Sequence, residues 1–371
     1  MTAVRAAFRG LTWDHPRGHD ALAAAAGDLI VWDTQPLEGF ESHPIDDLCA
    51  RYDLVVLDHP HLGEAVAAGC LTPLDELFAA DELAAWSAAS IGPTMRSYFF
   101  EGRQWALPLD AATQVSAARA DLVGDPPATW DEVEWIARSA PVALSLAGPH
   151  AFLSFASIAV ALGEEPASSP DHLLSTGTGL AALRLMESID AHAPAETHAL
   201  NPIKLLELMS ATDRLALCPL VYGYVNYAGR VAFGNAPAVT PGGRPGSTLG
   251  GTGIAISARS APSPALLDHV RWLMSTEAQT RFIPAHAGQP SARAAWFDDG
   301  VNAAAGEFYR RTARTCETAW VRPRHAGYIA FQSDASAVVR ATLAGDLDHR
   351  RGLDRLQQLY RASHSEREKT S

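Results

Sequence analysis

Two short turns of the sequence carry the side chains best suited to chemistry. Residues 14–17 read Asp-His-Pro-Arg, and residues 58–61 read Asp-His-Pro-His. Carboxylates accept hydrogen bonds from hydroxyl groups, imidazoles donate or accept them, and an arginine can hold a carboxylate or phosphate through two parallel hydrogen bonds. We therefore interpret these turns, with the tryptophan before the first, as candidate ligand contacts: Trp13, Asp14, His15, Arg17, Asp58, His59 and His61.

Three other uses of the two turns stay open. Each aspartate could simply cap a helix while the His-Pro pair shapes the turn. The pairs Asp14/His15 and Asp58/His59 could also act as general acids and bases, because histidine titrates near neutrality and a neighbouring carboxylate tunes its pKa. A metal ion would use the same groups, but their spacing matches no standard ligand arrangement, so we predict no metal site.

Other chemistries have little support in the sequence, and no cofactor is predicted. There is no G-x-G-x-x-G fingerprint after a strand and no phosphate-binding loop with its lysine. Lys204 and Lys369 are the only lysines, which leaves almost no candidate for Schiff-base chemistry. The formal net charge of −13 argues against nucleic acids and anionic membranes as partners.

The two turns are positioned by strands that alternate with helices. Apolar runs predict strands at residues 10–13, 29–32 and 53–57, and helices are predicted from about 20 to 26 and over 45–50. This alternation indicates a parallel sheet, in which ligands gather outside the carboxyl ends of the strands. Both Asp-His-Pro turns should therefore lie at one edge of one sheet.

The rest of the chain continues the mixed pattern. We predict an N-capping threonine, Thr129, that opens a helix over 130–138. Further helices are predicted at 151–163, 180–189, 202–210, 275–282, 301–315, 335–344 and 352–362, and strands at 141–147, 216–221 and 254–257. Residues 164–178 should form a surface loop, and residues 363–371 a mobile tail.

Tyrosines follow the predicted strand 216–221. Tyr222, Tyr224 and Asn226 could contact a ligand, because aromatic faces stack on sugar rings or flat molecules. Alternate members of this run could equally be core residues.

Three separated motifs resemble one known family. Residues 250–257 read Gly-Gly-Thr-Gly-Ile-Ala-Ile-Ser, residues 273–279 read Leu-Met-Ser-Thr-Glu-Ala-Gln, and residues 288–290 read Gly-Gln-Pro. With residues 69–75, 101–110 and 127–132, they are similar to the extracellular solute-binding proteins of family 1, the sugar-binding proteins of ABC importers.

The resemblance implies an α/β, two-lobed fold of the type II periplasmic-binding-protein kind. Each lobe would be a sheet flanked by helices, with the ligand cleft between them. Lobe 1 would comprise residues 1–110 and about 248–292, and lobe 2 residues 111–247 and about 293–371, with hinge crossings near 110, 248 and 292. The resemblance also implies further contacts near the crossings and in a late basic loop: Asp110, Thr113, Gly251, Thr252, Arg322, Arg324, His325 and Tyr328. Asp110 and Thr113 could instead belong to the hinge. The arginines would suit an anionic ligand, although a solvated basic turn is the alternative.

The location of the protein is an open expectation. No charged segment followed by an apolar one begins the sequence, so no signal peptide is predicted. The chain as given would then be cytoplasmic, and it would be periplasmic or extracellular if its start has been trimmed. The four cysteines are scattered and are expected to be reduced.

Two functions follow from these observations. The first is a small-molecule binding protein of the ABC-importer type that closes two lobes over a sugar-like or carboxylate-bearing ligand, with an ABC permease as partner if it is exported. The alternative is a cytoplasmic enzyme on the same scaffold, in which the Asp-His pairs perform acid/base chemistry, with metal assistance a weaker option.

Overall fold

A computed structural model describes residues 7–365. Its contacts divide the chain into two units, each assembled from separated segments. Unit 1 comprises Met1–Ala111, Gly250–Ala304 and Arg324–Ala326, and unit 2 comprises Ala112–Leu249, Ala305–Pro323 and Gly327–Ser371. The last long segment of unit 1 ends at Ala304 rather than near 292, because hydrogen bonds from Trp296 Nε1 to the Pro290 carbonyl and from Asn302 Nδ2 to the Trp296 carbonyl hold α14 and α15 to it.

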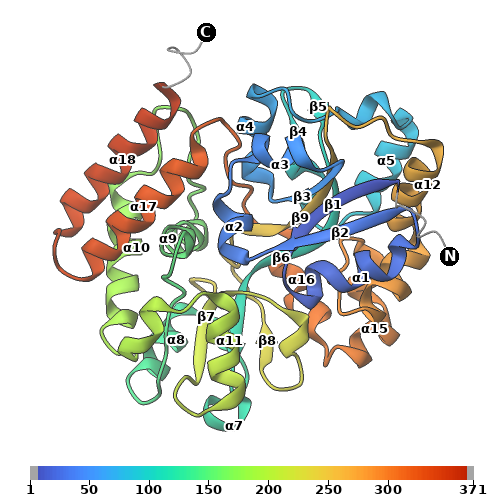
Figure 1. Cartoon of the computed structure of the whole chain (residues 1–371). Helices are drawn as coiled ribbons and strands as arrows, with labels where there is room; N and C mark the ends of the chain where they lie inside the picture. The colour runs from blue at the N-terminus through green and yellow to red at the C-terminus, as the bar shows by residue number, and fades with distance from the viewer. Residues whose placement is uncertain (1–6, 366–371) are drawn as a thin grey trace. The chain divides into compact units, whose positions relative to one another are not determined.

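Unit 1 is built on a mixed sheet with strand order β2-β1-β3-β9-β6. Strand β1 pairs in parallel with both β2 and β3, which confirms the predicted parallel arrangement, whereas β9 runs antiparallel to β3 (Figure 1). The strands are β1 (Phe8–Trp13), β2 (Ile30–Gln35), β3 (Leu54–Leu57), β6 (Leu107–Ala118, shared with unit 2) and β9 (Leu249–Ile256), and a hairpin adds β4 (Phe99–Phe100) and β5 (Arg103–Gln104).

Helices of unit 1 connect these strands. They are α1 (Pro16–Ala26), α2 (Leu37–Ser42), α3 (Ile45–Arg51), η1 (His59–His61), α4 (Leu62–Ala67), η2 (Leu74–Glu76), α5 (Ala80–Ala89), α6 (Thr94–Ser97), α12 (Pro264–Leu273), the π-helical turn η5 (Ala278–Phe282), α13 (Ile283–Ala285), α14 (Arg293–Phe297) and α15 (Asp299–Ala304).

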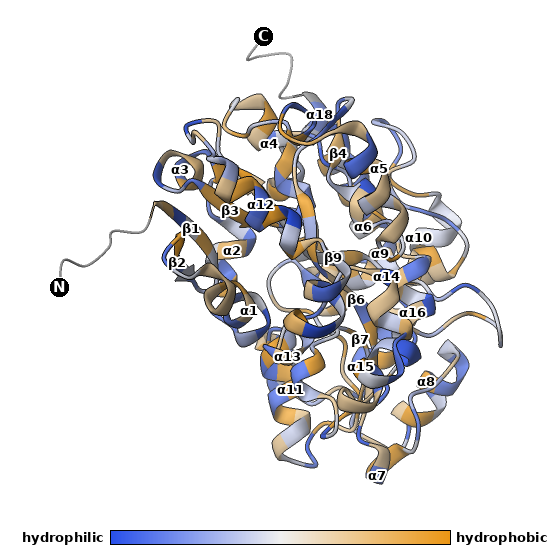
Figure 2. Ribbon diagram, turned by 90° about the vertical axis from the view of Figure 1, so that its right-hand side faces the viewer, coloured by the Kyte–Doolittle hydropathy of each residue, from blue (hydrophilic) through white to orange (hydrophobic). Residues whose placement is uncertain are grey.

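Strand β3 is buried on both faces, as its continuous apolar run predicts. Leu54 and Val56 belong to one hydrophobic cluster of unit 1, and Val55 and Leu57 belong to the other. Side chains alternate between the two faces of a strand, so the two clusters cover opposite faces of the sheet. The ribbon of β3 is accordingly hydrophobic throughout in Figure 2.

Unit 2 packs helices around the second part of β6. That part pairs antiparallel with β7 (Leu217–Tyr222) and β8 (Ala232–Gly234). Every residue of α9 (His150–Ala161) is buried, as expected of a helix that is apolar all round, and it packs against α10 (Thr176–Asp190) and α17 (Tyr328–Leu343). The other helices are α7 (Ala120–Val123), α8 (Trp130–Ala137), η3 (Ala195–Ala199), α11 (Pro202–Ala211), η4 (Val225–Tyr227), α16 (Phe308–Glu317) and α18 (His349–Ser365).

Several local predictions were wrong. Helix α1 begins at Pro16 rather than near residue 20, because proline is favoured in a first helical turn and His15 caps it. Residues 141–147 form no strand beyond an isolated bridge between Val142 and Leu217, and their apolar side chains instead pack into the core of unit 2. The predicted helix 301–315 is broken into α15 and α16, where Gly306 and Glu307 adopt positive φ angles of 58° and 63°.

Four boundaries also differ from the sequence prediction. The predicted helix 275–282 is observed as a π-helical turn followed by α13, and α10 begins inside the predicted loop 164–178. Helices α17 and α18 both begin earlier than predicted, and α18 extends to Ser365. The rest of the predicted mobile tail, 366–371, lies outside the described residues.

Candidate functional site

The two Asp-His-Pro turns follow neighbouring parallel strands of unit 1. The register pairs Gly10 with Leu54 and Leu11 with Val55. Continued past the strand ends, this register places Asp14 level with Asp58. The carboxyl ends of β1 and β3 therefore present both turns at the same edge of the sheet, where ligands gather in open α/β sheets.

In the first turn, the histidine rather than the aspartate caps the helix. His15 Nδ1 accepts a hydrogen bond of 3.1 Å from the Arg17 backbone N–H, whereas Asp14 is exposed. Burial, and then the charge of Arg17, lower the pKa of His15 from 6.5 to about 4. The imidazole is therefore neutral at pH 7, and one of its nitrogens already accepts a hydrogen bond.

In the second turn, the aspartate performs the capping role. Asp58 Oδ1 accepts a hydrogen bond of 2.8 Å from the His59 backbone N–H and lies 3.1 Å from His59 Nδ1. The His59 side chain is fully buried, with its ring edge-on to Tyr98, and His61 is also buried. Asp58 is thus the member of this turn that keeps access to solvent, with a side chain that is 19% exposed.

Arg17 does not extend into solvent but forms a buried ion pair. Its Nε and Nη2 donate to the two carboxylate oxygens of Asp110 at 2.7 and 2.5 Å, and the two side chains are 4% and 6% exposed. Burial raises the pKa of Asp110, while the charge of Arg17 opposes this rise. The bidentate geometry satisfies the arginine fork and the carboxylate together.

A small cavity lies beside this ion pair in unit 1. Its volume of about 30 Å³ is large enough to hold a water molecule. Four of the predicted contact residues line it, namely Trp13, Arg17, Asp110 and Thr252. Gln289 also lines it and was not predicted from the sequence. Among the described residues, no partner is found for the buried Nε1 of Trp13. Gly251, the neighbour of Thr252, has a φ of 90°, which favours glycine.

The aromatic candidates of unit 2 follow β7 as predicted. Tyr222 is half-buried, with its ring edge-on to His150 at 5.8 Å, Tyr224 is buried beside Tyr227, and Asn226 is exposed. Strand pairing of β6 with β7 brings in Thr113, whose carbonyl accepts a hydrogen bond from Gly223. Its Oγ1 is buried and has no partner within residues 7–365.

The late basic loop is divided between the units, and both of its arginines are bound within their own unit. Arg324, in unit 1, donates through Nη1 to the carbonyls of Arg96, Ser97 and Phe99 at 2.7–3.1 Å. Arg322, in unit 2, donates to Gln332 Oε1 at 3.2 Å. His325 and Tyr328 are buried, in unit 1 and unit 2 respectively.

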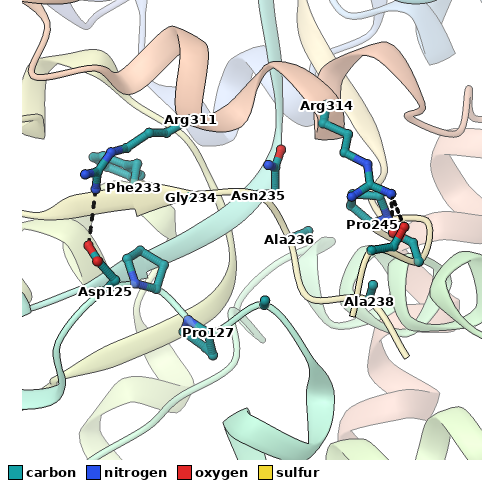
Figure 3. Close-up of a pocket in the computed structure, with 14 residues that line it drawn as sticks. Asp125, Pro127, Phe233, Gly234, Asn235, Ala236, Ala238, Pro245, Arg311 and Arg314 are labelled. Atoms are coloured by element: carbon teal, nitrogen blue, oxygen red, sulfur yellow. Dashed lines mark hydrogen bonds and ion pairs between the residues drawn. The ribbon is translucent and has the colours of Figure 1, made fainter. Parts of the chain in front are cut away.

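Unit 2 also contains a pocket that the sequence analysis did not predict. It measures about 290 Å³ and is walled by prolines, alanines and Phe233, as Figure 3 shows. Two arginines of α16 border it: Arg311 pairs with Asp125 at 3.3 Å, and Arg314 donates to the carbonyls of Gly242 and Gly243. The sequence signal for this pair of arginines was their i, i+3 spacing, which places both on one face of α16.

The described part of the chain contains neither a metal-binding cluster nor a helix that could span a membrane. No group of three histidine, cysteine, aspartate or glutamate side chains is arranged to hold a metal ion among residues 7–365. Over the same residues, no helix combines the length and the apolar character that crossing a membrane requires.

The chain belongs to the bacterial extracellular solute-binding protein family, whose profile matches residues 48–295, more than half of the sequence. The family predicted from the motifs is thereby confirmed, and the protein is a solute-binding protein. No curated protein matches the chain by sequence.

Solved structures show the same fold at low sequence identity. A solute-binding protein of an ABC transporter from Agrobacterium radiobacter K84, in complex with ribitol, is 20% identical with a TM-score of 0.79, and the match covers 96% of this chain and 98% of that one. Maltose-bound MalE3 of T. maritima is 19% identical with a TM-score of 0.78, covering 95% and 98%. A protein from Agrobacterium vitis S4 with bound D-mannitol is 19% identical with a TM-score of 0.72, covering 98% and 99%. These matches confirm the two-lobed α/β fold class.

Proposed function

We propose that the solute of this protein is neutral and polyhydroxylated, a sugar or a sugar alcohol. The similar structures were solved with ribitol, maltose and D-mannitol, all of them uncharged polyols or sugars. The proposal chooses between the sugar-like and the carboxylate-bearing ligands that the sequence left open.

This choice rests on the hydrogen-bond and ion-pair partners that the three predicted ligand-binding arginines already have. A carboxylate ligand needs a cation that is free to pair with it. Arg17 is already matched by Asp110 in a buried bidentate pair, Arg324 donates to three backbone carbonyls, and Arg322 donates to Gln332. The charge of Arg17 is neutralised by Asp110, and the Nη1 groups of Arg324 and Arg322 already donate to acceptors of the protein, which favours an uncharged ligand.

The ligand contacts that we propose in unit 1 are acceptors and donors suited to hydroxyl groups. Asp14 is exposed and Asp58 is partly exposed at the same sheet edge, and carboxylates accept hydrogen bonds from ligand hydroxyls. The Nε1 of Trp13 is a buried donor that a hydroxyl oxygen or a water can satisfy. Tyr222 and Asn226 are the corresponding candidates in unit 2, and the buried residues of the predicted set would support these contacts.

Titration calorimetry with matched ligands tests the proposal. We expect ribitol, D-mannitol, maltose or galactose to bind, and galacturonate, in which a carboxylate replaces the hydroxymethyl group of galactose, to bind at least about tenfold more weakly than galactose. Tighter binding of carboxylates than of neutral sugars would reject the proposal. Asp14→Asn should weaken binding of the best ligand, while Asp20→Asn, an exposed change on α1, should not.

The transport role adds a partner and a location to the proposal. We propose that the protein is exported, in line with the extracellular family description, and that it delivers its solute to an ABC permease, in line with the ABC-transporter proteins of the same fold. Fractionation of cells that express the full native gene tests this directly. A product found only in the cytoplasm would contradict export and would leave solute binding as a separate question.

A further inference from the structure

Two of the four cysteines lie close together in unit 1. Cys49 is buried on α3, and Cys70 follows the turn that ends α4. Cys70 is partly exposed and packs against the hydrophobic cluster that contains Cys49. A hydrogen bond from the Cys70 thiol is the largest influence on the pKa of Cys49, which it lowers.

Backbone contacts hold both cysteines in this arrangement. The Cys70 N–H donates to the Ala65 carbonyl, which closes the end of α4, and the Cys70 carbonyl accepts from Ala258. One residue further on, Arg259 Nη1 donates to the Ala50 carbonyl, next to Cys49 on α3. The segment after β9 therefore ties the backbone beside one cysteine to the backbone beside the other.

We propose that Cys49 and Cys70 form a disulfide when the protein meets an oxidising environment. Disulfides require cysteines whose side chains already approach each other on backbones that need not move far. The interaction between the two thiols and their packing in one hydrophobic cluster place the two side chains near each other. The inference concerns the covalent structure of unit 1 and is independent of which solute the protein binds.

The chemistry is thiol–disulfide exchange with a small disulfide, RSSR, as oxidant. Cys70 is the more exposed thiol, so it exchanges first: a bond forms between its sulfur and one RS group, and the other leaves and takes up the thiol proton as RSH. The Cys49 sulfur then attacks the Cys70 sulfur, and the second RSH leaves. Two protein thiols are oxidised, and one RSSR is reduced to two RSH.

The two steps should differ in rate. The contact with Cys49 raises the pKa of Cys70, and burial adds to this effect, so little Cys70 thiolate is available for the first exchange. The interaction that lowers the pKa of Cys49 needs the Cys70 thiol, so it is lost once Cys70 carries the RS group, and the second step depends instead on the proximity of the two sulfurs. We expect the reaction to accelerate as the pH rises and the mixed disulfide not to accumulate.

Peptide mapping of the whole chain after treatment with oxidised glutathione provides the test. Trypsin cleaves after Arg51, so the disulfide would link peptide 18–51 to peptide 52–96. We expect the linked peptides, a mass loss of about 2 Da from two hydrogen atoms, and a fall from four free thiols to two. The melting temperature should rise by several °C relative to the reduced protein, because the cross-link restricts the unfolded chain.

Single variants separate the pair from the other thiols. Cys218→Ser and Cys316→Ser should retain the cross-link, because both residues are fully buried elsewhere, in unit 2. Cys49→Ser should instead trap Cys70 as a stable mixed disulfide with glutathione. Wild-type protein that keeps four free thiols, or that stops at the mixed disulfide on Cys70, would overturn the proposal even if a variant fails to fold.

Discussion

At the scale of single residues, the buried pair of Arg17 and Asp110 joins two parts of unit 1 that are far apart in sequence. Neither side chain has enough access to solvent to be hydrated alone, since both are about 5% exposed. Desolvation of the two charges offsets much of their attraction, so such a pair contributes less net stability than its geometry suggests. Removal of one partner alone is strongly destabilising, because it leaves a buried charge uncompensated.

Asp110→Ala should therefore lower the free energy of unfolding by about 3–5 kcal/mol. The double variant Arg17→Met/Asp110→Leu should recover much of this loss, because it removes both charges. Urea denaturation measures both effects. The exposed pair of Arg9 and Asp33 provides the comparison, and Asp33→Asn should be nearly neutral. Equal losses at the two pairs would show that burial does not govern the effect.

His15 should make stability depend on pH. Its pKa is lowered to about 4 in the folded protein, so the unfolded chain binds more protons between that value and its ordinary 6.5. Stability from this group is complete above pH 6.5 and is lost as the pH falls toward 4, by up to about 1.4 kcal/mol per pH unit. His15→Asn keeps a capping acceptor but does not titrate, so its stability should fall less steeply over this range.

Denaturation curves at several pH values measure this difference. His15→Ala should show the same shallow pH dependence as His15→Asn. Its free energy of unfolding should be lower by about 1 kcal/mol at every pH, because the helix cap is also lost. Parallel curves for wild type and His15→Asn would contradict the assignment to His15.

The sequence alone predicted that the two Asp-His-Pro turns lie at one edge of the sheet. It did not predict which distant residues the arginines bind. The strands before Asp14 and Asp58 are readable as apolar runs, and their shared edge follows from the parallel pairing. Arg324 was predicted to face a ligand, but its guanidinium donates to carbonyls more than 220 positions earlier in the chain. No local pattern carries such a long-range contact. Arg17 was similarly ambiguous until Asp110 was located.

At the scale of elements, local signals succeeded where the chain's own neighbours decide the structure. Thr129 caps α8 as predicted, and the structure adds a return hydrogen bond from Glu132 that completes a capping box. The segment 141–147 has the composition of a strand, but its apolar side chains pack into the helical core of unit 2. Burial was therefore predictable there, and strand pairing was not.

Helix α4 depends on a glycine for its packing within unit 1. A Cβ added at Gly63 would lie 1.9 Å from the Arg324 carbonyl oxygen and 2.4 Å from the Ala326 nitrogen. Both are backbone atoms, which cannot move aside as a flexible side chain can. We expect Gly63→Ala to destabilise the protein by about 4 kcal/mol or more, as measured by thermal or urea denaturation.

Gly177 provides the matched control. It lies in the first turn of α10 with open space around its Cβ position, so Gly177→Ala should be neutral or stabilising by about 0.5 kcal/mol. A small effect at Gly63 would mean that residues 324–326 can shift away from α4.

At the scale of the whole molecule, neither unit is a continuous stretch of sequence. Unit 1 needs residues from both sides of unit 2's first segment, and strand β9, which it places between β3 and β6, comes from the second half of the chain. A fragment of residues 1–249 should therefore show no cooperative unfolding transition by circular dichroism or calorimetry. Mixing it with residues 250–371 should restore one. A sharp transition in the first fragment alone would mean that one of the units folds without its later segments.

This arrangement also bears on how the protein is made. Domains are commonly able to fold one after another as they leave the ribosome. Here the strand that completes the first sheet is translated only after the first long segment of unit 2, and unit 2 itself waits for its last two helices, α17 and α18. The first sheet therefore stays incomplete until about residue 256 has been made, and unit 2 until its last helices follow, which is the interval in which a chaperone or an export factor could hold the chain.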